Sequence, residues 1–227
     1  MHRLASKSLF AVAVLIVVAA VSFWILFQLL AVRISPICEA AWIGDVDSVR
    51  TIAQMRPELV DEMCSPTSNT TFIAPPIVWA VLGRQQSAIA LLYELGADID
   101  GVDSYGRSPL YHAIGENLLP ELAMLLELDA DANSMAREPW SPLLFASLSG
   151  STEAVDLLCS HGANPMYEIG GGVVLHRIII LANVEAACQV IALSRARLTP
   201  TQVEVAAQLI RDRREPDEAQ EMLQCLR

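Results

Sequence analysis

Lysine is nearly absent from this chain. It occurs once, at Lys7, among 15 lysines and arginines, against 26 aspartates and glutamates, and the formal net charge is −11 at pH 7. A surface with this excess of negative charge repels the phosphates of nucleic acids, so we expect no nucleic-acid partner. The same charge favours a basic protein as the partner, and ordinary solubility is the alternative explanation for it.

The residue patterns that catalysis and metal binding require are also missing. None of the four histidines has a serine or cysteine nucleophile at a spacing typical of a hydrolase. The cysteines contain no C-x-x-C pair and no Cys/His spacing of a zinc site. Glycines 170–172 are not followed by the lysine and serine of a phosphate loop. We therefore predict that the chain is not an enzyme and takes no metal and no cofactor.

The chain has five cysteines, an odd number, so at least one thiol stays free. In an oxidising compartment the others could pair. We expect Cys38–Cys64 and Cys188–Cys225, a hypothesis only, because a sequence does not fix connectivity. Cys159 lies on a regular helix face and is the expected free thiol.

A long uncharged apolar run covers residues 9–32. At about 1.5 Å per residue it forms a helix about 36 Å long, enough to cross a hydrocarbon core of about 30 Å. A cleaved signal peptide is the alternative, but its apolar region is usually about 7–15 residues and ends at a small-x-small site, which is missing before Arg33. We predict a signal anchor over 9–32, after a cytoplasmic N-terminus at 1–8.

Basic residues near this run set its expected orientation. Arg3 and Lys7 precede it, and only Arg33 follows it closely. The side with more positive charge tends to stay in the cytoplasm, so the rest of the chain is expected outside it. Arginine far outnumbers lysine, which is associated with GC-rich bacterial genomes. We therefore expect a single-pass protein of the bacterial inner membrane with its C-terminal domain in the periplasm.

An internal repeat dominates the rest of the chain. A proline and a helix-ending residue both recur at intervals of 33 residues, and the two sets are Pro76, Pro109 and Pro142, and Gly96, Asp129 and Gly162. A period of this length is the mark of a solenoid built from helix pairs. Ser108 and Ser141 precede their prolines and are expected to cap a first helix. The glycines suit a left-handed residue after a second helix, where Asp129 carries a modest steric cost.

These residues resemble the ankyrin family. Ser108-Pro109-Leu110-Tyr111 and Ser141-Pro142-Leu143-Leu144 are similar to its Thr-Pro-Leu-His opening, and the segment 91–100 is similar to its Leu-Leu-x-x-Gly-Ala-Asp-x-Asn close. The resemblance extends over about residues 35–193. It implies an all-α solenoid of about five repeats, with the ankyrin-repeat domain at 33–193. In most repeats the family's histidine is replaced, by Cys38, Val78, Tyr111 and Leu144, so its hydrogen bonds must be lost or replaced.

The last part of the chain departs from the repeat. Thr199-Pro200 predicts a helix start with a helix to about Arg214, and Pro216 begins another helix. We interpret 194–227 as a C-terminal helical cap, because the end of a solenoid needs a polar outer face.

The resemblance implies binding through finger tips and inner helix positions. By register these partner-binding candidates are Trp42, Phe72, Leu82, Ser104, Tyr105, Arg107, Glu116, Met135, Arg137 and Trp140. Tyrosine, tryptophan, arginine and methionine are enriched at interfaces. The alternative is that Trp42, Leu82 and Trp140 pack within the stack. The enlarged finger 57–75 is either a specific contact or a tolerated insertion.

These expectations combine into a non-catalytic protein–protein interaction module, anchored in the bacterial inner membrane and facing the periplasm. The sharper hypothesis is an immunity or inhibitor protein that neutralises a secreted toxin. The alternative is a periplasmic adaptor that protects or localises an envelope enzyme, for example in oxidative-stress defence.

Overall fold

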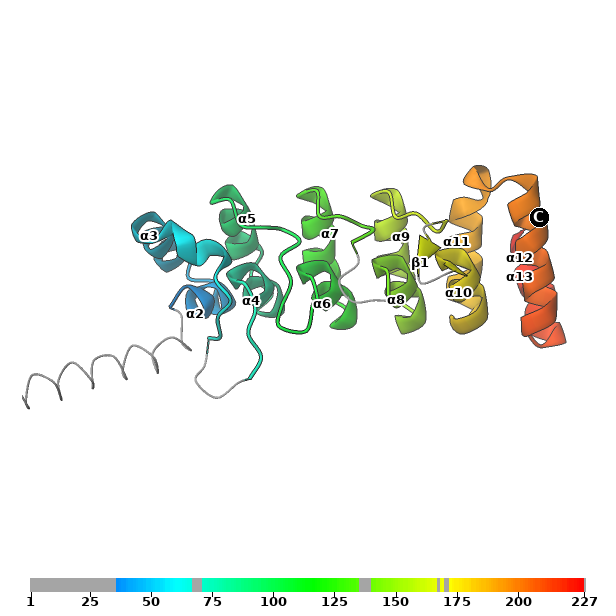
Figure 1. Cartoon of the computed structure of the whole chain (residues 1–227), viewed down its shortest axis with the longest axis horizontal. Coiled ribbons are helices and arrows are strands. Elements are labelled where there is room, and N and C mark those ends of the chain that lie inside the picture. Colours follow the sequence, from blue (N-terminus) through cyan, green and yellow to red (C-terminus); the bar gives the residue numbers. More distant parts are fainter. Residues whose placement is uncertain (1–35, 67–70, 135–139, 167, 170–171, 227) are drawn as a thin grey trace, which may run out of the picture.

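The computed structural model describes residues 36–66, 71–134, 140–166, 168–169 and 172–226. Over these residues the chain is an elongated row of antiparallel helix pairs (Figure 1). The pairs are α2 (Pro36–Ile43) with α3 (Val46–Met55), α4 (Pro76–Leu82) with α5 (Gln86–Glu94), α6 (Pro109–Gly115) with α7 (Leu119–Glu127), α8 (Pro142–Ser149) with α9 (Thr152–Ser160), α10 (Val174–Leu181) with α11 (Val184–Ser194), and α12 (Pro200–Arg213) with α13 (Pro216–Cys225). Short 3-10 helices lie at Pro57–Asp61 and Arg195–Arg197. The predicted solenoid of five repeats followed by two further helices is confirmed.

The predicted all-α solenoid carries one small addition in a finger. Strands β1 (Glu168–Ile169) and β2 (Gly172–Val173) form a small antiparallel hairpin in the finger before α10, with Glu168 opposite Val173. Each strand has two residues, which is too short for an alternating pattern to be visible in the sequence.

The core runs along the whole row and comes from two kinds of helix. The first helices carry small residues at their contact face, and Ala41, Ala80, Ala113 and Ala146 are all fully buried. These alanines let neighbouring repeats approach closely. The second helices bury one leucine each at the same register, at Leu92, Leu125 and Leu158. Burying each such leucine contributes roughly 1.5–3 kcal/mol.

The helix ends follow the predicted chemistry. Ser108 Oγ accepts a hydrogen bond from Tyr111 N at 3.2 Å, and Ser141 Oγ accepts one from Leu144 N at 3.2 Å. Thr199 caps α12 in a reciprocal arrangement with Gln202. A left-handed residue follows α5, α7 and α9, with φ +90° at Gly96, +63° at Asp129 and +89° at Gly162. The predicted substitution of aspartate for glycine in a left-handed position is therefore confirmed.

Asparagine and aspartate side chains join successive fingers. The backbone N–H of Asp98 donates to Asp61 Oδ1 at 2.9 Å, that of Asp131 to Asp100 Oδ1 at 3.2 Å, and that of Asn164 to Asn133 Oδ1 at 2.7 Å. These bonds recur from finger to finger, in repeats where the family's histidine is absent. They keep the bases of the fingers in register.

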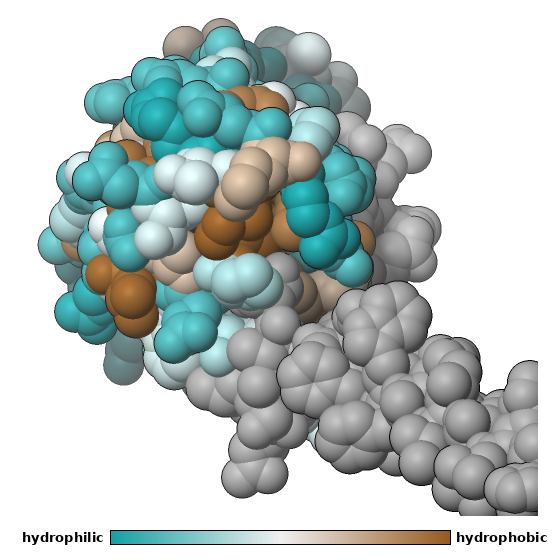
Figure 2. All heavy atoms as spheres, turned by 90° about the vertical axis from the view of Figure 1, so that its left-hand side faces the viewer, coloured by the Kyte–Doolittle hydropathy of each residue, from teal (hydrophilic) through white to brown (hydrophobic). Residues whose placement is uncertain are grey.

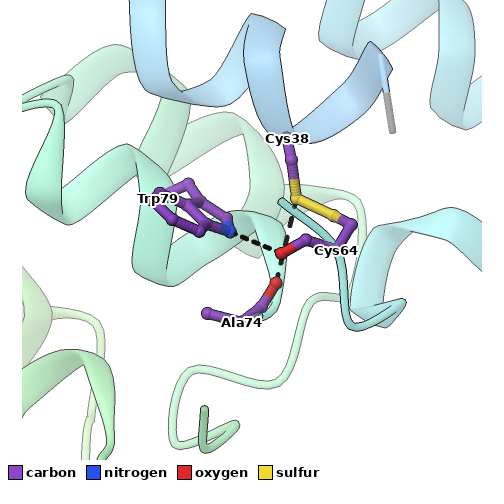
Figure 3. Close-up of a disulfide and its surroundings, with 4 residues drawn as sticks. All are labelled: Cys38, Cys64, Ala74 and Trp79. Carbon is purple, nitrogen blue, oxygen red and sulfur yellow. Dashed lines mark hydrogen bonds between the residues drawn. A yellow bond between two sulfur atoms is a disulfide. The ribbon is translucent and has the colours of Figure 1, made fainter. Parts of the chain in front are cut away.

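Two disulfides lie at opposite ends of the row, and both expected pairs are confirmed. Cys38 in α2 is bonded to Cys64 in the enlarged finger, and Cys188 in α11 to Cys225 in α13. Figure 3 shows the first of these, with Trp79 Nε1 donating to Cys64 O at 2.9 Å and Ala74 O lying 3.8 Å from Cys38 Sγ. Cys159 is the free cysteine.

The helix pair α2–α3 forms the N-terminal end of the row, and no other described repeat covers its outer face (Figure 1). On this face apolar residues gather near the centre and hydrophilic residues surround them (Figure 2). Two apolar side chains of this repeat, Ile43 and Met55, are 63% and 70% exposed. The predicted anchor at 9–32 lies outside the described residues, and within them no helix combines the length and apolarity needed to cross a membrane.

Candidate protein-binding surface

An unbroken series of aromatic contacts crosses the first four repeats. It begins at Trp42 and ends at Phe145, and we call its members the aromatic row: Trp42, Trp79, Phe72, Tyr105, Arg107, Tyr111 and Phe145. Successive contacts measure 5.9, 4.9, 6.0, 5.3, 5.7 and 4.2 Å between ring centroids, or between ring centroid and guanidinium carbon. These distances lie in the range of favourable aromatic and cation–π contacts.

The row is partly covered and partly open. Trp79 is buried, whereas Trp42 and Tyr105 are 40% and 47% exposed. The rings of Tyr111 and Phe145 are stacked with an interplanar angle of 3°, which joins α6 to α8. The open rings therefore rest on a rigid support of buried or stacked ones, an arrangement that lowers the entropy lost on binding.

A buried carboxylate fixes the finger that carries Tyr105 and Arg107. Asp103 Oδ1 accepts from Tyr105 N at 2.7 Å and from Arg107 N at 3.0 Å, and Asp103 Oδ2 lies 2.8 Å from His112 Nε2. The backbone N–H of Ser104 also donates to Ile73 O in the preceding finger, at 2.9 Å. The finger is thus tied both to α6 and to its neighbour, so its two side chains are held in place.

His112 completes this support. Burial lowers the pKa of His112, and the hydrogen bond to Asp103 opposes that shift. The imidazole is then neutral at physiological pH, with its Nε2–H donating to the carboxylate. Phe72 packs against the same imidazole edge-on, at 5.8 Å between centroids.

A groove lies beside the row. It has a volume of about 390 Å³ and is lined by Arg107, Tyr111, Trp140 and Phe145. No described residue accepts a hydrogen bond from the Arg107 guanidinium, and its Nε is buried without a partner. The groove therefore combines aromatic walls with the guanidinium of Arg107, whose N–H groups donate to no other described residue.

The repeats are similar to those of known proteins. The family model described as ankyrin repeats matches residues 77–169 in three copies. A crystal structure of an ankyrin repeat domain from Acinetobacter baumannii superimposes with a TM-score of 0.64, at 24% identity, covering 84% of this chain and 95% of that one. The chain contains ankyrin repeats. Ankyrin repeats indicate a protein–protein interaction module, and the fold is typically a non-enzymatic scaffold.

Curated relatives share the repeats over a short stretch. The ankyrin repeat protein nuc-2 of Neurospora crassa is 36% identical over 77 residues, covering 34% of this chain and 7% of that protein. A putative E3 ubiquitin-protein ligase of Arabidopsis thaliana is 40% identical over 89 residues, or 38% of this chain and 24% of the ligase. The B-cell lymphoma 3 protein homolog of Mus musculus is 42% identical over 80 residues, or 35% and 18%. The match thus spans under a quarter of each relative.

The predicted binding residues of the chain fall into three groups. The structure brings Trp42, Phe72, Tyr105 and Arg107 together in the aromatic row, and Trp140 lines the adjoining groove. Three others lie apart from the row: Ser104 contacts the preceding finger, Leu82 packs against the core, and Glu116 is exposed at the end of α6. Met135 and Arg137 lie outside the described residues. Binding by any of them stays a prediction.

Sequence reasoning missed three members of the row, namely Trp79, Tyr111 and Phe145. Trp79 and Phe145 stand at one register position, two repeats apart, and Tyr111 occupies the place of the family's histidine. An aromatic residue recurring at one register was a usable signal. The stacking of Tyr111 on Phe145 could not be predicted from the sequence, because it depends on the spacing between helices α6 and α8.

Proposed function

We propose that this chain is a non-catalytic protein-binding module whose partner docks along the aromatic row. The observation that carries the proposal is a line of tryptophan, tyrosine and arginine side chains, partly open to solvent, beside a groove lined by aromatic side chains and Arg107. These are the residue types that dominate the energetics of protein interfaces. The buried Asp103–His112 pair supports the proposal, because it holds two of these side chains in place before binding.

Alanine variants of the surface test this proposal. Tyr105→Ala and Trp140→Ala should each weaken binding by about 2 kcal/mol, which is roughly 30-fold in Kd, with little change in melting temperature. Tyr93→Ala is a matched control, because Tyr93 is 39% exposed and lies on α5 outside the row. If Trp140→Ala instead lowers the melting temperature and leaves affinity intact, Trp140 belongs to the stack. If both variants bind and melt normally, the enlarged finger 57–75 becomes the leading site.

We further propose that the module is anchored in the bacterial inner membrane and faces the periplasm. The apolar run 9–32 supports the anchor, and the two disulfides suit an oxidising compartment. Few residues separate this run from α2, so the apolar end of the first repeat would lie close to the bilayer. An alkaline phosphatase fused after Arg227 should be active. An inactive phosphatase with an active cytoplasmic reporter at the same point would reverse the proposed orientation.

The role that we propose within this class is immunity or inhibition directed at a secreted toxin. A photo-crosslinking residue in place of Tyr105, in cells of the source organism, would trap the protein that contacts the row. We expect the trapped partner to be toxic when produced alone in the envelope and harmless with this chain. If the partner is a harmless envelope enzyme that loses stability or position without the chain, the adaptor role replaces the proposed one.

A further inference from the structure

Arg107 lies between Tyr105 and Tyr111 in the aromatic row, and among the described residues no polar group pairs with its side chain. Its guanidinium carbon lies 5.3 Å from the Tyr105 ring centroid and 5.7 Å from that of Tyr111. In the described part of the chain no carboxylate forms an ion pair with it, and its Nε is buried and unbonded. An arginine normally uses its planar fork for carboxylates or phosphates, so this one holds unused donors in a fixed position.

The surroundings of this guanidinium strengthen its attraction for an anion. Three aromatic side chains, Tyr111, Phe145 and Trp140, complete the lining of the groove. These rings displace part of the water around the guanidinium, so a charge pair formed there is stronger than one in bulk water. Asp103, the nearest carboxylate along the chain, already accepts from two backbone N–H groups and from His112, so it does not neutralise Arg107.

We propose that this groove binds a carboxylate of the partner, from an acidic residue with an apolar neighbour in an extended segment. The carboxylate would pair with the guanidinium, and the apolar neighbour would pack on Phe145 and Trp140. This inference rests on the proposed protein-binding function and adds the chemistry of the contact. A basic side chain is disfavoured there because Arg107 repels it. A nucleic-acid phosphate is disfavoured by the formal net charge of −11.

The contact does not conflict with a partner of basic overall charge. Net charge acts over distances of about a Debye length and raises the rate of encounter, whereas a single groove acts at contact distance and selects the residue that is bound. A partner can therefore approach through its positive surface and dock through one acidic residue.

The test uses two small probes and the full-length protein in detergent micelles. N-acetyl-L-phenylalanine carries a carboxylate beside an apolar ring, and its amide has nearly the same shape without the charge. Fluorine NMR of protein labelled with 5-fluorotryptophan gives one signal for each of the four tryptophans, and Trp140→Phe identifies the groove signal. We expect the acid to shift the Trp140 signal with Kd on the order of millimolar, and to bind at least about tenfold more tightly than the amide.

Variants at Arg107 decide whether the preference comes from this residue. Arg107→Gln should abolish the preference for the acid, whereas Arg107→Lys should keep part of it, because lysine retains the charge but not the planar fork. Arg50→Gln is the matched control, because Arg50 is exposed on α3, away from the groove. Equal binding of acid and amide, or a preference that survives in Arg107→Gln, would overturn the inference.

The same variants distinguish a failure of the carboxylate inference from a failure of the proposed protein-binding function. If acid and amide bind equally while Tyr105→Ala and Trp140→Ala still weaken the natural partner, the row binds a protein but the groove does not recognise a carboxylate. If those two variants also leave the affinity for the partner unchanged, the aromatic row is not the binding surface.

Discussion

The turn after each second helix offers a test of backbone strain in which side-chain packing plays little part. Gly96, Asp129 and Gly162 occupy the same position in three successive repeats, all with positive φ. A Cβ added at Gly96 or Gly162 would meet no heavy atom within 4 Å. The cost of a side chain there is therefore the cost of the left-handed backbone alone.

The magnitude follows from this geometry. A left-handed conformation costs a residue with a Cβ roughly 1–2 kcal/mol, and a β-branched side chain resists it most. Gly96→Val should therefore lower the free energy of unfolding by about 1–2 kcal/mol. For a protein of this size that is a fall of roughly 2–8 °C in melting temperature. Asp129→Gly should act in the opposite direction by up to about 1 kcal/mol, because the greater freedom of glycine in the unfolded chain, about 0.5–1 kcal/mol, offsets part of the gain.

Circular dichroism on the full chain would measure both variants, by heating and by urea titration. The urea slope should stay constant, so that shifts in the midpoint report stability. An unchanged midpoint for Gly96→Val would refute the assignment of strain to this turn. A loss of stability in Asp129→Gly would mean that the Asp129 side chain makes a stabilising contact, although no described residue hydrogen-bonds to it. The double variant should be additive, because the two sites lie in different turns.

Three further predictions concern titratable groups. Asp100→Asn should raise the melting temperature at neutral pH and lose this advantage in acid. Burial raises the pKa of Asp100, the hydrogen bond from the Asp131 backbone opposes this shift, and the charges of Asp131 and Asp98 add to it, so ionisation of Asp100 destabilises the fold as pH rises; Asn133 already fills the equivalent position. Cys159 should resist iodoacetamide in the native protein and react readily when unfolded, as followed by mass spectrometry, because burial raises its pKa to about 11. Burial lowers the pKa of His112 from its usual 6.5. The stability that neutral His112 contributes should therefore be fully present above pH 6.5 and be lost as the pH falls through the lowered pKa. This dependence should flatten in His112→Asn, measured by urea midpoints.

Much of the fold was predictable because its determinants are local. Proline at the first helical position, a serine cap before it and a left-handed residue after the second helix each act within a few residues. Their recurrence at 33-residue intervals identified the repeats. The left-handed residues between the two helices of a repeat were missed. Gly44 and Gly150 mark this position in two repeats, but Arg84 and Asn117 occupy it in two others and hide the pattern.

The candidate site was only half predictable. Tyr105 and Arg107 followed from their place in a finger, since that depends on register alone. The buried Asp103–His112 pair and the stacking of Tyr111 on Phe145 depend on distances between elements, which periodicity does not supply. Leu82 lies apart from the aromatic row and packs against the core, and its role in binding stays a prediction. Near it α2 and α4 approach so closely that a Cβ on Gly83 would lie 2.1 Å from Trp42 O, a distance that periodicity does not supply.

The positions of the two disulfides bear on where unfolding begins. A row of repeats normally frays from its ends, because a terminal unit has a neighbour on one side only. Here Cys38–Cys64 cross-links the first unit and Cys188–Cys225 the last, with sequence separations of 26 and 37 residues. Loops of this size stabilise by roughly 3–4 kcal/mol each in the chain-entropy description. In an oxidising environment the first opening would move from the ends toward the interior repeats, and a protease would cut there. A reductant would return the first cuts to the two ends, so the cleavage pattern itself would record the redox state in which the protein is held.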